Sequence, residues 1–288
     1  MNKFILALIV LALCALSQGE TPRSASEKAD LEALAKLTKQ TAIEAVTHSP
    51  QSNTACAFTF QTGADLASLK YCVTNNGNIV QFEVPRGVPM ISQVSLAEGY
   101  GVCDLTSNVS YADWGGEGDT GNWGQANVVS HSANQVKIAR TTSDGIWTLT
   151  QTISQVGGGA PNAKISMALH NNTTVKREVF LVRYADVSAG GFEFNDFDST
   201  VNSALGWNSA SPQGESMFRY GIALENLGTV NFGYDALVQN TPSAPDACNP
   251  FANAASGLIN MDGSVVMFYD MRVAKSKTMT VNMAYKGW

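Results

Sequence analysis

The chain has 288 residues and a formal net charge of −6; 44% of its residues are hydrophobic and only 15% are charged. This length fits one large or two small domains and allows a sizeable core. Lys and Arg form no cluster along the sequence, so the basic footprint that nucleic-acid binding requires is missing. We therefore expect no nucleic acid among the partners of the protein.

The first 19 residues are typical of a secretory signal peptide. Lys3 supplies the positive start, Phe4–Leu16 forms the apolar core, and Ala15-Leu16-Ser17 fits a cleavage site. The apolar run is short for a membrane anchor, and no second run could span a bilayer. The sequence predicts a protein that is secreted, periplasmic or on the cell surface, with no transmembrane segment once the signal is removed.

Residues 20–53 are predicted to be a helical spacer followed by a linker. Ser24-Ala25-Ser26-Glu27 fits a capping box, and a modest apolar stripe predicts a short N-terminal helix over Ser26–Thr47. Ser49-Pro50-Gln51-Ser52-Asn53 then has the composition of a linker. The remaining residues, 54–288, are expected to form the folded domain.

Short runs of alternating polar and apolar residues predict strands throughout residues 54–288. The clearest runs are Ile146–Gln155, Lys164–His170 and Glu178–Val187, which we interpret as a three-stranded meander. The third run is apolar on both faces, which is typical of a central strand. More than ten short strands predict an all-β fold, a large antiparallel β-sandwich. The other expected strands include Ala55–Phe60, Leu69–Thr74, Asn78–Val84, Gln135–Thr141, Met217–Glu225, Ser264–Val273 and Thr278–Tyr285. Asn75-Asn76-Gly77 predicts a hairpin turn between the second and third of these.

Four cysteines follow the predicted signal peptide, and they allow three pairings. Cys56 and Cys72 lie on neighbouring strand-like runs, so they are predicted to pair, which leaves Cys103 with Cys248. A metal site is the alternative, but the sequence has no Cys-x-x-Cys, and a secreted chain meets an oxidising environment.

The first candidate site is the Gly-rich loop Asp113–Gly124. Tryptophan faces can stack on sugar rings, and carboxylates and amides can hydrogen-bond sugar hydroxyls. A loop this rich in oxygen could instead hold Ca²⁺, or its tryptophans could plug one end of the sandwich. The predicted ligand-binding residues are Asp113, Trp114, Asn122, Trp123 and Trp207.

The second candidate is the acidic segment Asn195–Ser199, which we expect to lie in a loop. Asp196 and Asp198 would share one side of an extended backbone and could bind Ca²⁺ or act as an acid and base in glycoside cleavage. A solvated turn is the plain alternative. The predicted metal ligands from both candidates are Glu117, Asp119, Asp196 and Asp198.

One charge interrupts the apolar third run of the predicted meander. Arg183 lies on the face of Val179 and Leu181, so it needs a buried partner. Asp270 on a neighbouring strand is the expected partner.

Three functions remain open from the sequence. The first is a non-enzymatic binding or surface-interaction protein with polysaccharide or cell-surface glycan as its partner, because no catalytic motif is found. The second is a glycan-active hydrolase or lyase that uses carboxylates among Asp113, Glu117, Asp196 and Asp198. The third is a structural envelope or appendage subunit. No cofactor is expected apart from Ca²⁺.

Overall fold

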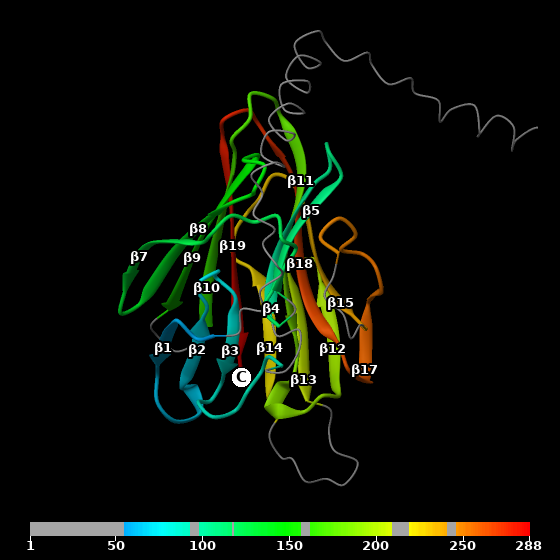
Figure 1. Ribbon diagram of the computed structural model, residues 1–288. Helices are drawn as coiled ribbons and strands as arrows, with labels where there is room; N and C mark the ends of the chain where they lie inside the picture. The colour runs from blue at the N-terminus through cyan, green and yellow to red at the C-terminus, as the bar shows by residue number, and fades with distance from the viewer. Residues whose placement is uncertain (1–54, 93–97, 117, 157–161, 209–218, 241–245) are drawn as a thin grey trace, which may run out of the picture. The chain divides into compact units, whose positions relative to one another are not determined.

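Antiparallel β-sheets make up almost all the regular structure, so the predicted all-β sandwich is confirmed (Figure 1). In the computed structural model the residues described are 55–92, 98–116, 118–156, 162–208, 219–240 and 246–288. The predicted signal peptide, the N-terminal helix and the linker lie outside these ranges. Helical structure within them is limited to two short 3₁₀ turns, η2 (Asp65–Ala67) and η3 (Ala189–Gly191).

None of the helical structure in the described ranges is long and apolar enough to cross a bilayer.

The larger sheet has nine strands in the described part of the chain, all antiparallel to their neighbours. In spatial order they are β17 (Gly257–Met261), β12 (Asn195–Thr200), β13 (Ser203–Asn208), β14 (Gly221–Asn226), β19 (Thr278–Gly287), β10 (Asn162–Asn171), β9 (Trp147–Val156), β8 (Gln135–Thr141) and β7 (Asn127–Ser132).

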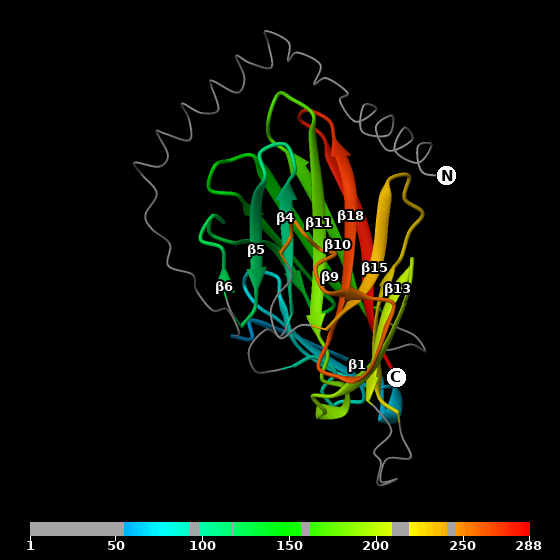
Figure 2. The same ribbon diagram turned by 90° about the vertical axis from the view of Figure 1, so that its right-hand side faces the viewer.

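The second sheet packs against the larger one and faces the viewer in Figure 2. In spatial order its described strands are β16 (Ala254–Ala255), β15 (Gly233–Gln239), β18 (Ser264–Val273), β11 (Arg177–Asp186), β4 (Glu98–Asp104), β5 (Val109–Trp114) and β6 (Gly118–Asp119). β11 lies in the middle of this sheet, as its two apolar faces predicted.

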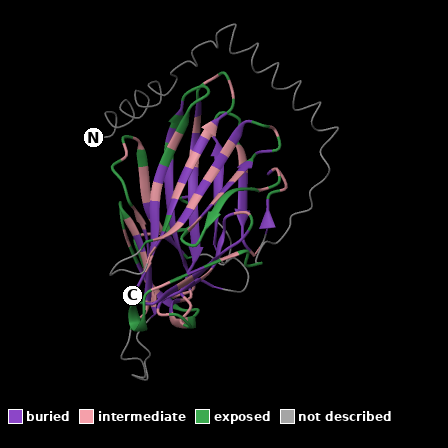
Figure 3. Cartoon of the chain, turned by 90° about the vertical axis from the view of Figure 1, so that its left-hand side faces the viewer, coloured by how far each residue is buried: buried purple, intermediate pink, exposed green. Residues whose placement is uncertain are grey.

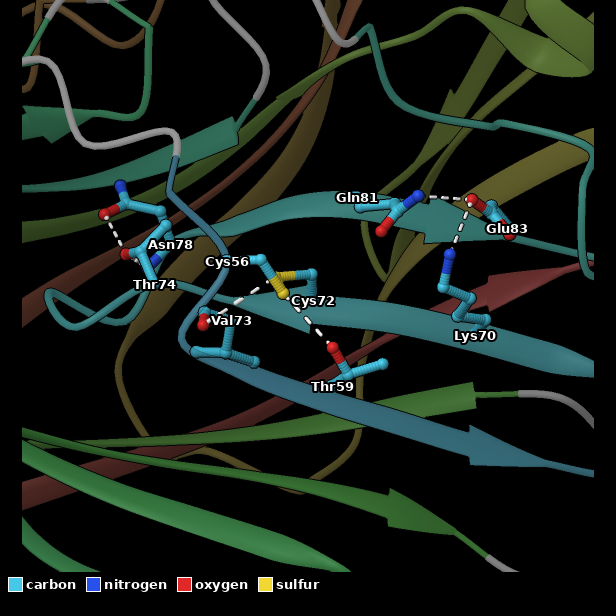
Figure 4. Close-up of a disulfide and its surroundings, with 9 residues drawn as sticks. All are labelled: Cys56, Thr59, Lys70, Cys72, Val73, Thr74, Asn78, Gln81 and Glu83. Carbon is cyan, nitrogen blue, oxygen red and sulfur yellow. Dashed lines mark hydrogen bonds and ion pairs between the residues drawn. A yellow bond between two sulfur atoms is a disulfide. The ribbon is translucent and has the colours of Figure 1, made fainter.

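A small sheet of β1 (Phe58–Thr62), β2 (Leu69–Val73) and β3 (Ile79–Glu83) lies beside the sandwich. The turn predicted between β2 and β3 is present, with Gly77 at φ 94°. The Cys56–Cys72 disulfide joins the segment before β1 to β2 (Figure 4). The Phe82 ring packs near Tyr285 of β19, which joins this sheet to the core.

The predicted meander is wrong at its third strand. β9 and β10 pair as expected, but β10 then pairs with β19, and the chain crosses to the second sheet before β11 begins. Local alternation shows that a segment is a strand, but it does not say which sheet that strand joins. The turn Asn172–Lys176 can therefore connect two sheets as readily as two neighbours.

The outer face of the larger sheet is open among the described residues. Along β10, Ile165, Met167 and Leu169 are fully buried toward the second sheet, whereas Ser166 and Ala168 are partly exposed. Figure 3 shows this alternation as stripes along the strands of the larger sheet. The inner stripe forms the core, and the outer stripe meets solvent.

The outer face of the second sheet is covered instead. The Cys103–Cys248 disulfide, with a Cα–Cα distance of 4.9 Å, fastens the segment 246–256 over β4, β11 and β18. Phe251 of this segment packs edge-on against Phe180 and Phe268. This cover explains why β11 is apolar on both faces.

Arg183 is buried in the core, and its partner is Glu98 of β4 rather than Asp270. Asp270 stands opposite Phe180, whose side chain points to the other face of β11, so it cannot reach the guanidinium. Arg183 also donates to Gln151 Oε1 at 2.5 Å and to the Gly77 carbonyl at 3.2 Å. Glu98 in turn accepts hydrogen bonds from the Ile79 N–H and the Tyr285 hydroxyl.

We call this set the Arg183 network: Glu98, Arg183, Gln151, Tyr285, Ile79 and Gly77. Its members come from the second sheet, from the larger sheet and from the small sheet with its turn, so one buried ion pair connects all three. A second buried pair joins Arg177 Nη1 to Asp104 Oδ2 at 2.6 Å. Buried charges of this kind must be fully paired, because an unpaired one is strongly destabilising.

Candidate functional site

Trp114, expected as an exposed stacking platform, is only 7% exposed. It ends β5 and lies on the outer face of the second sheet, where Gly99 and Gly101 leave a flat trough for the indole. A Cβ at Gly99 would overlap the Trp114 ring, so the indole can lie flat on the sheet only because this position is glycine. The expectation of exposure is wrong because these glycines and Ala247 enclose the ring.

Trp123 is 2% exposed, and the Arg140 guanidinium lies 5.2 Å from its ring centroid. Arg140 is also the partner of two predicted site carboxylates. It binds Asp113 Oδ2 at 2.5 Å and Asp119 Oδ2 at 2.7 Å, and all three side chains are buried. The structure does bring Asp113 and Asp119 together, but around a guanidinium rather than around a sugar or Ca²⁺, the two ligands that the sequence suggested for this loop.

Two further predicted residues belong to the same loop. The Asn122 side chain is turned inward, donating to the Ser110 carbonyl at 2.8 Å and accepting from the Thr120 hydroxyl. Glu117 lies outside the described residues. The arrangement is that of a packed loop closing one end of the sandwich, the plain alternative that the sequence left open.

The two predicted site loops do not meet. Asp113, Trp114 and Asp119 lie on β5 and β6 at one edge of the second sheet, whereas β12 packs against β15 near the opposite edge. The segment with Asp196 and Asp198 is a strand rather than a loop, because its alternation continues through β12 into β13. Phe197 enters the core, and the two carboxylates point to the outer face.

Trp207 has the most accessible position of the predicted aromatic residues. It lies on β13 directly opposite Asp196 of β12, so both side chains share the open outer face of the larger sheet. Asp196 also accepts a hydrogen bond from the Asn260 N–H at 2.9 Å, which holds the carboxylate in place.

Trp288 adds a second indole beside Trp207. Trp207 pairs on its other side with Gly221, and a Cβ at Gly221 would overlap the Trp288 ring. Mutual backbone hydrogen bonds of 3.1 Å between Gly221 and Trp288 fix the chain end there. Gly221 thus makes room for an indole that is 46% exposed, next to Trp207. The sequence could not reveal this pair, because it depends on the register of β13 and β14.

Two more rings gather at the same end of the sheet. Gly190, with φ 71°, lies against both Phe192 and Tyr220, and Tyr220 directly precedes Gly221. Phe192 is 53% exposed. The Tyr220 side chain points to the opposite face of the larger sheet from Gly221, so the outer face carries Trp207 and Trp288 alone of these rings, and we call these two residues the aromatic rim. Figure 1 shows the chain end, marked C, beside β14 at this end of the larger sheet.

Three carboxylates lie near one another where β11 ends. Burial first, and then the carboxylates of Asp262 and Glu193, raise the pKa of Asp186 to about 7, against a hydrogen bond with the Ser92 side chain. The described residues contain no group of three or more His, Cys, Asp or Glu side chains arranged to hold a metal ion. The arrangement offers aromatic faces and hydrogen-bond acceptors.

The raised pKa of Asp186 predicts a pH-dependent stability. An unfolded Asp loses its proton near pH 4, whereas folded Asp186 holds it to about pH 7, so this contribution to stability is complete below about pH 4 and lost as the pH rises through 7. Compared with the wild type, Asp186→Asn should be about equally stable near pH 4 and more stable by about 2–4 kcal/mol near pH 8.

Urea unfolding at the two pH values measures this difference. Burial also raises the pKa of Glu98, so the variant is expected to keep part of the pH dependence that the wild-type free energy of unfolding shows. If the free energies of unfolding of variant and wild type differ by the same amount at both pH values, the pH-dependent stability does not come from Asp186.

Comparisons with known proteins bear on the fold. No protein-family model matches the sequence, and no curated protein is similar to it. Among solved structures, a bacterial glucoamylase complexed with acarbose has a TM-score of 0.51 at 11% identity, covering 84% of this chain and 34% of that chain. A heparan sulfate lyase from Pedobacter heparinus has a TM-score of 0.46 at 7% identity, covering 89% of this chain and 41% of that one.

A galactose mutarotase related enzyme from Lactobacillus acidophilus has a TM-score of 0.40 at 5% identity, covering 80% of this chain and 97% of that one. Identities this low bear on the fold and not on activity or on particular residues. Over 84% of its length, the fold of this chain resembles part of the bacterial glucoamylase.

Proposed function

We propose that this protein is a secreted or periplasmic, non-enzymatic carbohydrate-binding protein whose contact surface is the aromatic rim. The observation that carries the proposal is the cross-strand row Asp196–Trp207–Gly221, with the Trp288 indole over the glycine. Indole faces cover the apolar face of a sugar ring, and a neighbouring carboxylate accepts hydrogen bonds from its hydroxyls. Two disulfides fit an oxidising compartment outside the cytoplasm.

The charge around the rim favours a neutral sugar. Glu193, Asp196, Asp198 and Asp262 outnumber the exposed Arg219 at this end of the sheet, while Lys286 of the outer face is paired with Glu225. An anionic glycan would meet like charges here, whereas a neutral one meets hydrogen-bond acceptors. We therefore infer a neutral polysaccharide as the rim ligand.

Affinity electrophoresis through gels containing starch, xylan, β-glucan or galactan tests the proposal. We expect retardation in at least one gel, and a loss of affinity of about tenfold or more, which corresponds to ~1.4 kcal/mol, in Trp207→Ala. Phe251→Ala is the matched control, because Phe251 is an exposed aromatic residue on the cover of the second sheet.

Two outcomes of this experiment would change the proposal. Equal retardation of wild type and Trp207→Ala would place the contact surface elsewhere. Release of soluble sugars from a retained polysaccharide would favour the hydrolase or lyase alternative over a pure binding role.

A further inference from the structure

A cavity of about 420 Å³ lies at the other end of the sandwich from the aromatic rim. Met279, in its wall, is near the start of β19, and Trp288 follows the end of that strand, about 30 Å away at the usual rise per residue. The cavity is therefore independent of the rim. Its lining residues are Asn231, Phe232, Gly233, Asp270, Arg272 and Met279.

The register of β15 and β18 explains why the cavity exists. β15 begins at Gly233, which pairs with Asp270, so β18 continues past its neighbour and leaves a notch. A Cβ at Gly233 would lie 3.3 Å from the Cβ of Asp270, and a longer side chain there would narrow the opening. Phe232 packs edge-on against Tyr269, which faces the core, so its ring closes the inner side of the notch, opposite the face of Asp270 and Arg272.

Basic residues from distant parts of the sequence converge beside the notch. The turn 172–176 lies against the turn 274–277, joined by hydrogen bonds from Ser276 N to the Thr173 carbonyl and from Asn171 N to the Lys277 carbonyl. The two turns carry three exposed lysines, for which no ion pair is found among the described residues. We call Lys176, Arg272, Lys275 and Lys277 the basic tip.

Arg272 is the basic residue that lines the cavity. Its Nε contacts Glu178 Oε1 at 2.9 Å, which orients the guanidinium and leaves its terminal N–H groups available. Asp270, two residues earlier on the same face of β18, can accept hydrogen bonds from hydroxyls. A guanidinium, a carboxylate and an amide beside one cavity match a ring that carries both hydroxyl groups and an acidic group.

We propose that this cavity binds an acidic sugar unit, a uronate, with its carboxylate on Arg272 and its hydroxyls toward Asp270 and Asn231. The lysines of the basic tip attract the anion in a protein whose net charge is otherwise negative. The neutral-sugar surface and the acidic-sugar cavity are two separate sites.

The test is calorimetric titration of the full-length protein at low ionic strength with α-1,4-linked trigalacturonate and with the neutral galactotriose of the same linkage. We expect the acidic trisaccharide to bind about tenfold or more tightly than the neutral one, and Arg272→Ala to remove that preference. Lys164→Ala, which removes an exposed lysine from the outer face of the larger sheet, should have no effect.

The variants separate this proposal from the rim. Trp207→Ala should leave trigalacturonate binding intact. Loss of polysaccharide binding at the rim and loss of trigalacturonate binding at the cavity can therefore be told apart. Equal affinity for the two trisaccharides would overturn the proposal. So would unchanged binding by an Arg272→Ala variant with a wild-type circular dichroism spectrum, or displacement of trigalacturonate by inorganic sulfate as effectively as by galacturonate, since sulfate offers charge without a sugar ring.

Discussion

Replacing Arg183 with methionine is expected to lower the free energy of unfolding by about 3–5 kcal/mol. The substitution leaves Glu98 buried without its counter-charge, and it also removes the donors to Gln151 and to the Gly77 carbonyl. Because the Arg183 network connects all three sheets, its loss should affect the whole described unit at once. Urea unfolding, followed by circular dichroism with both disulfides intact, measures the change.

Arg272→Met is the matched control for this substitution. Arg272 lies on β18, next to the strand that carries Arg183. Its ion pair with Glu178 is exposed, with 71% of the Arg272 side chain and 46% of the Glu178 side chain accessible. Exposed pairs of this kind contribute at most about 1 kcal/mol, so the control should unfold almost as the wild type does. A loss below about 1 kcal/mol in Arg183→Met would show that the buried network is not what joins the sheets.

Removing the Cys103–Cys248 bridge by a double alanine substitution is expected to cost about 5 kcal/mol, in the chain-entropy account of disulfides. The bridge closes a loop of 145 residues, and it fastens the cover 246–256 over the apolar outer face of the second sheet. Its loss frees the unfolded chain and loosens that cover. Thermal and urea unfolding of the oxidised protein measure the difference.

The Cys56–Cys72 bridge provides the comparison. It spans 16 residues, so its removal should cost about 3 kcal/mol, less than removal of the longer bridge. If both double variants lose the same free energy of unfolding, then loop length and the anchored cover do not explain the larger contribution expected of the Cys103–Cys248 bridge.

The sequence predicted most strands and turns, because both depend on neighbouring residues. The alternation from Trp147 through Ile153 places Leu149 in the core, and Asn75-Asn76-Gly77 forms the turn it predicts. Both disulfides follow from the proximity of Cys56 and Cys72 along two strand-like runs. The sheet to which β11 belongs could not be predicted, since that choice is made by β4 and β18, far away in sequence.

The candidate sites were harder to predict for the same reason. An acidic loop with tryptophans has one composition whether it faces solvent or surrounds Arg140, and only tertiary packing separates the two cases. Trp207 was identified from the sequence, but its neighbour Trp288 becomes visible only through the pairing of Gly221 with both residues. The basic tip likewise needs two turns about 100 residues apart to come together.

Tryptophan fluorescence during titration with an oligosaccharide of the retained polysaccharide tests the central claim most directly. The chain has five tryptophans; Trp114, Trp123 and Trp147 are buried, whereas Trp207 and Trp288 are accessible on the aromatic rim. We predict an emission change on binding that disappears in the Trp207→Phe/Trp288→Phe double variant, which keeps aromatic rings at both positions. If the emission change in that variant is as large as in the wild type, it comes from the buried tryptophans. That result would contradict the assignment of the rim as the sugar-binding surface.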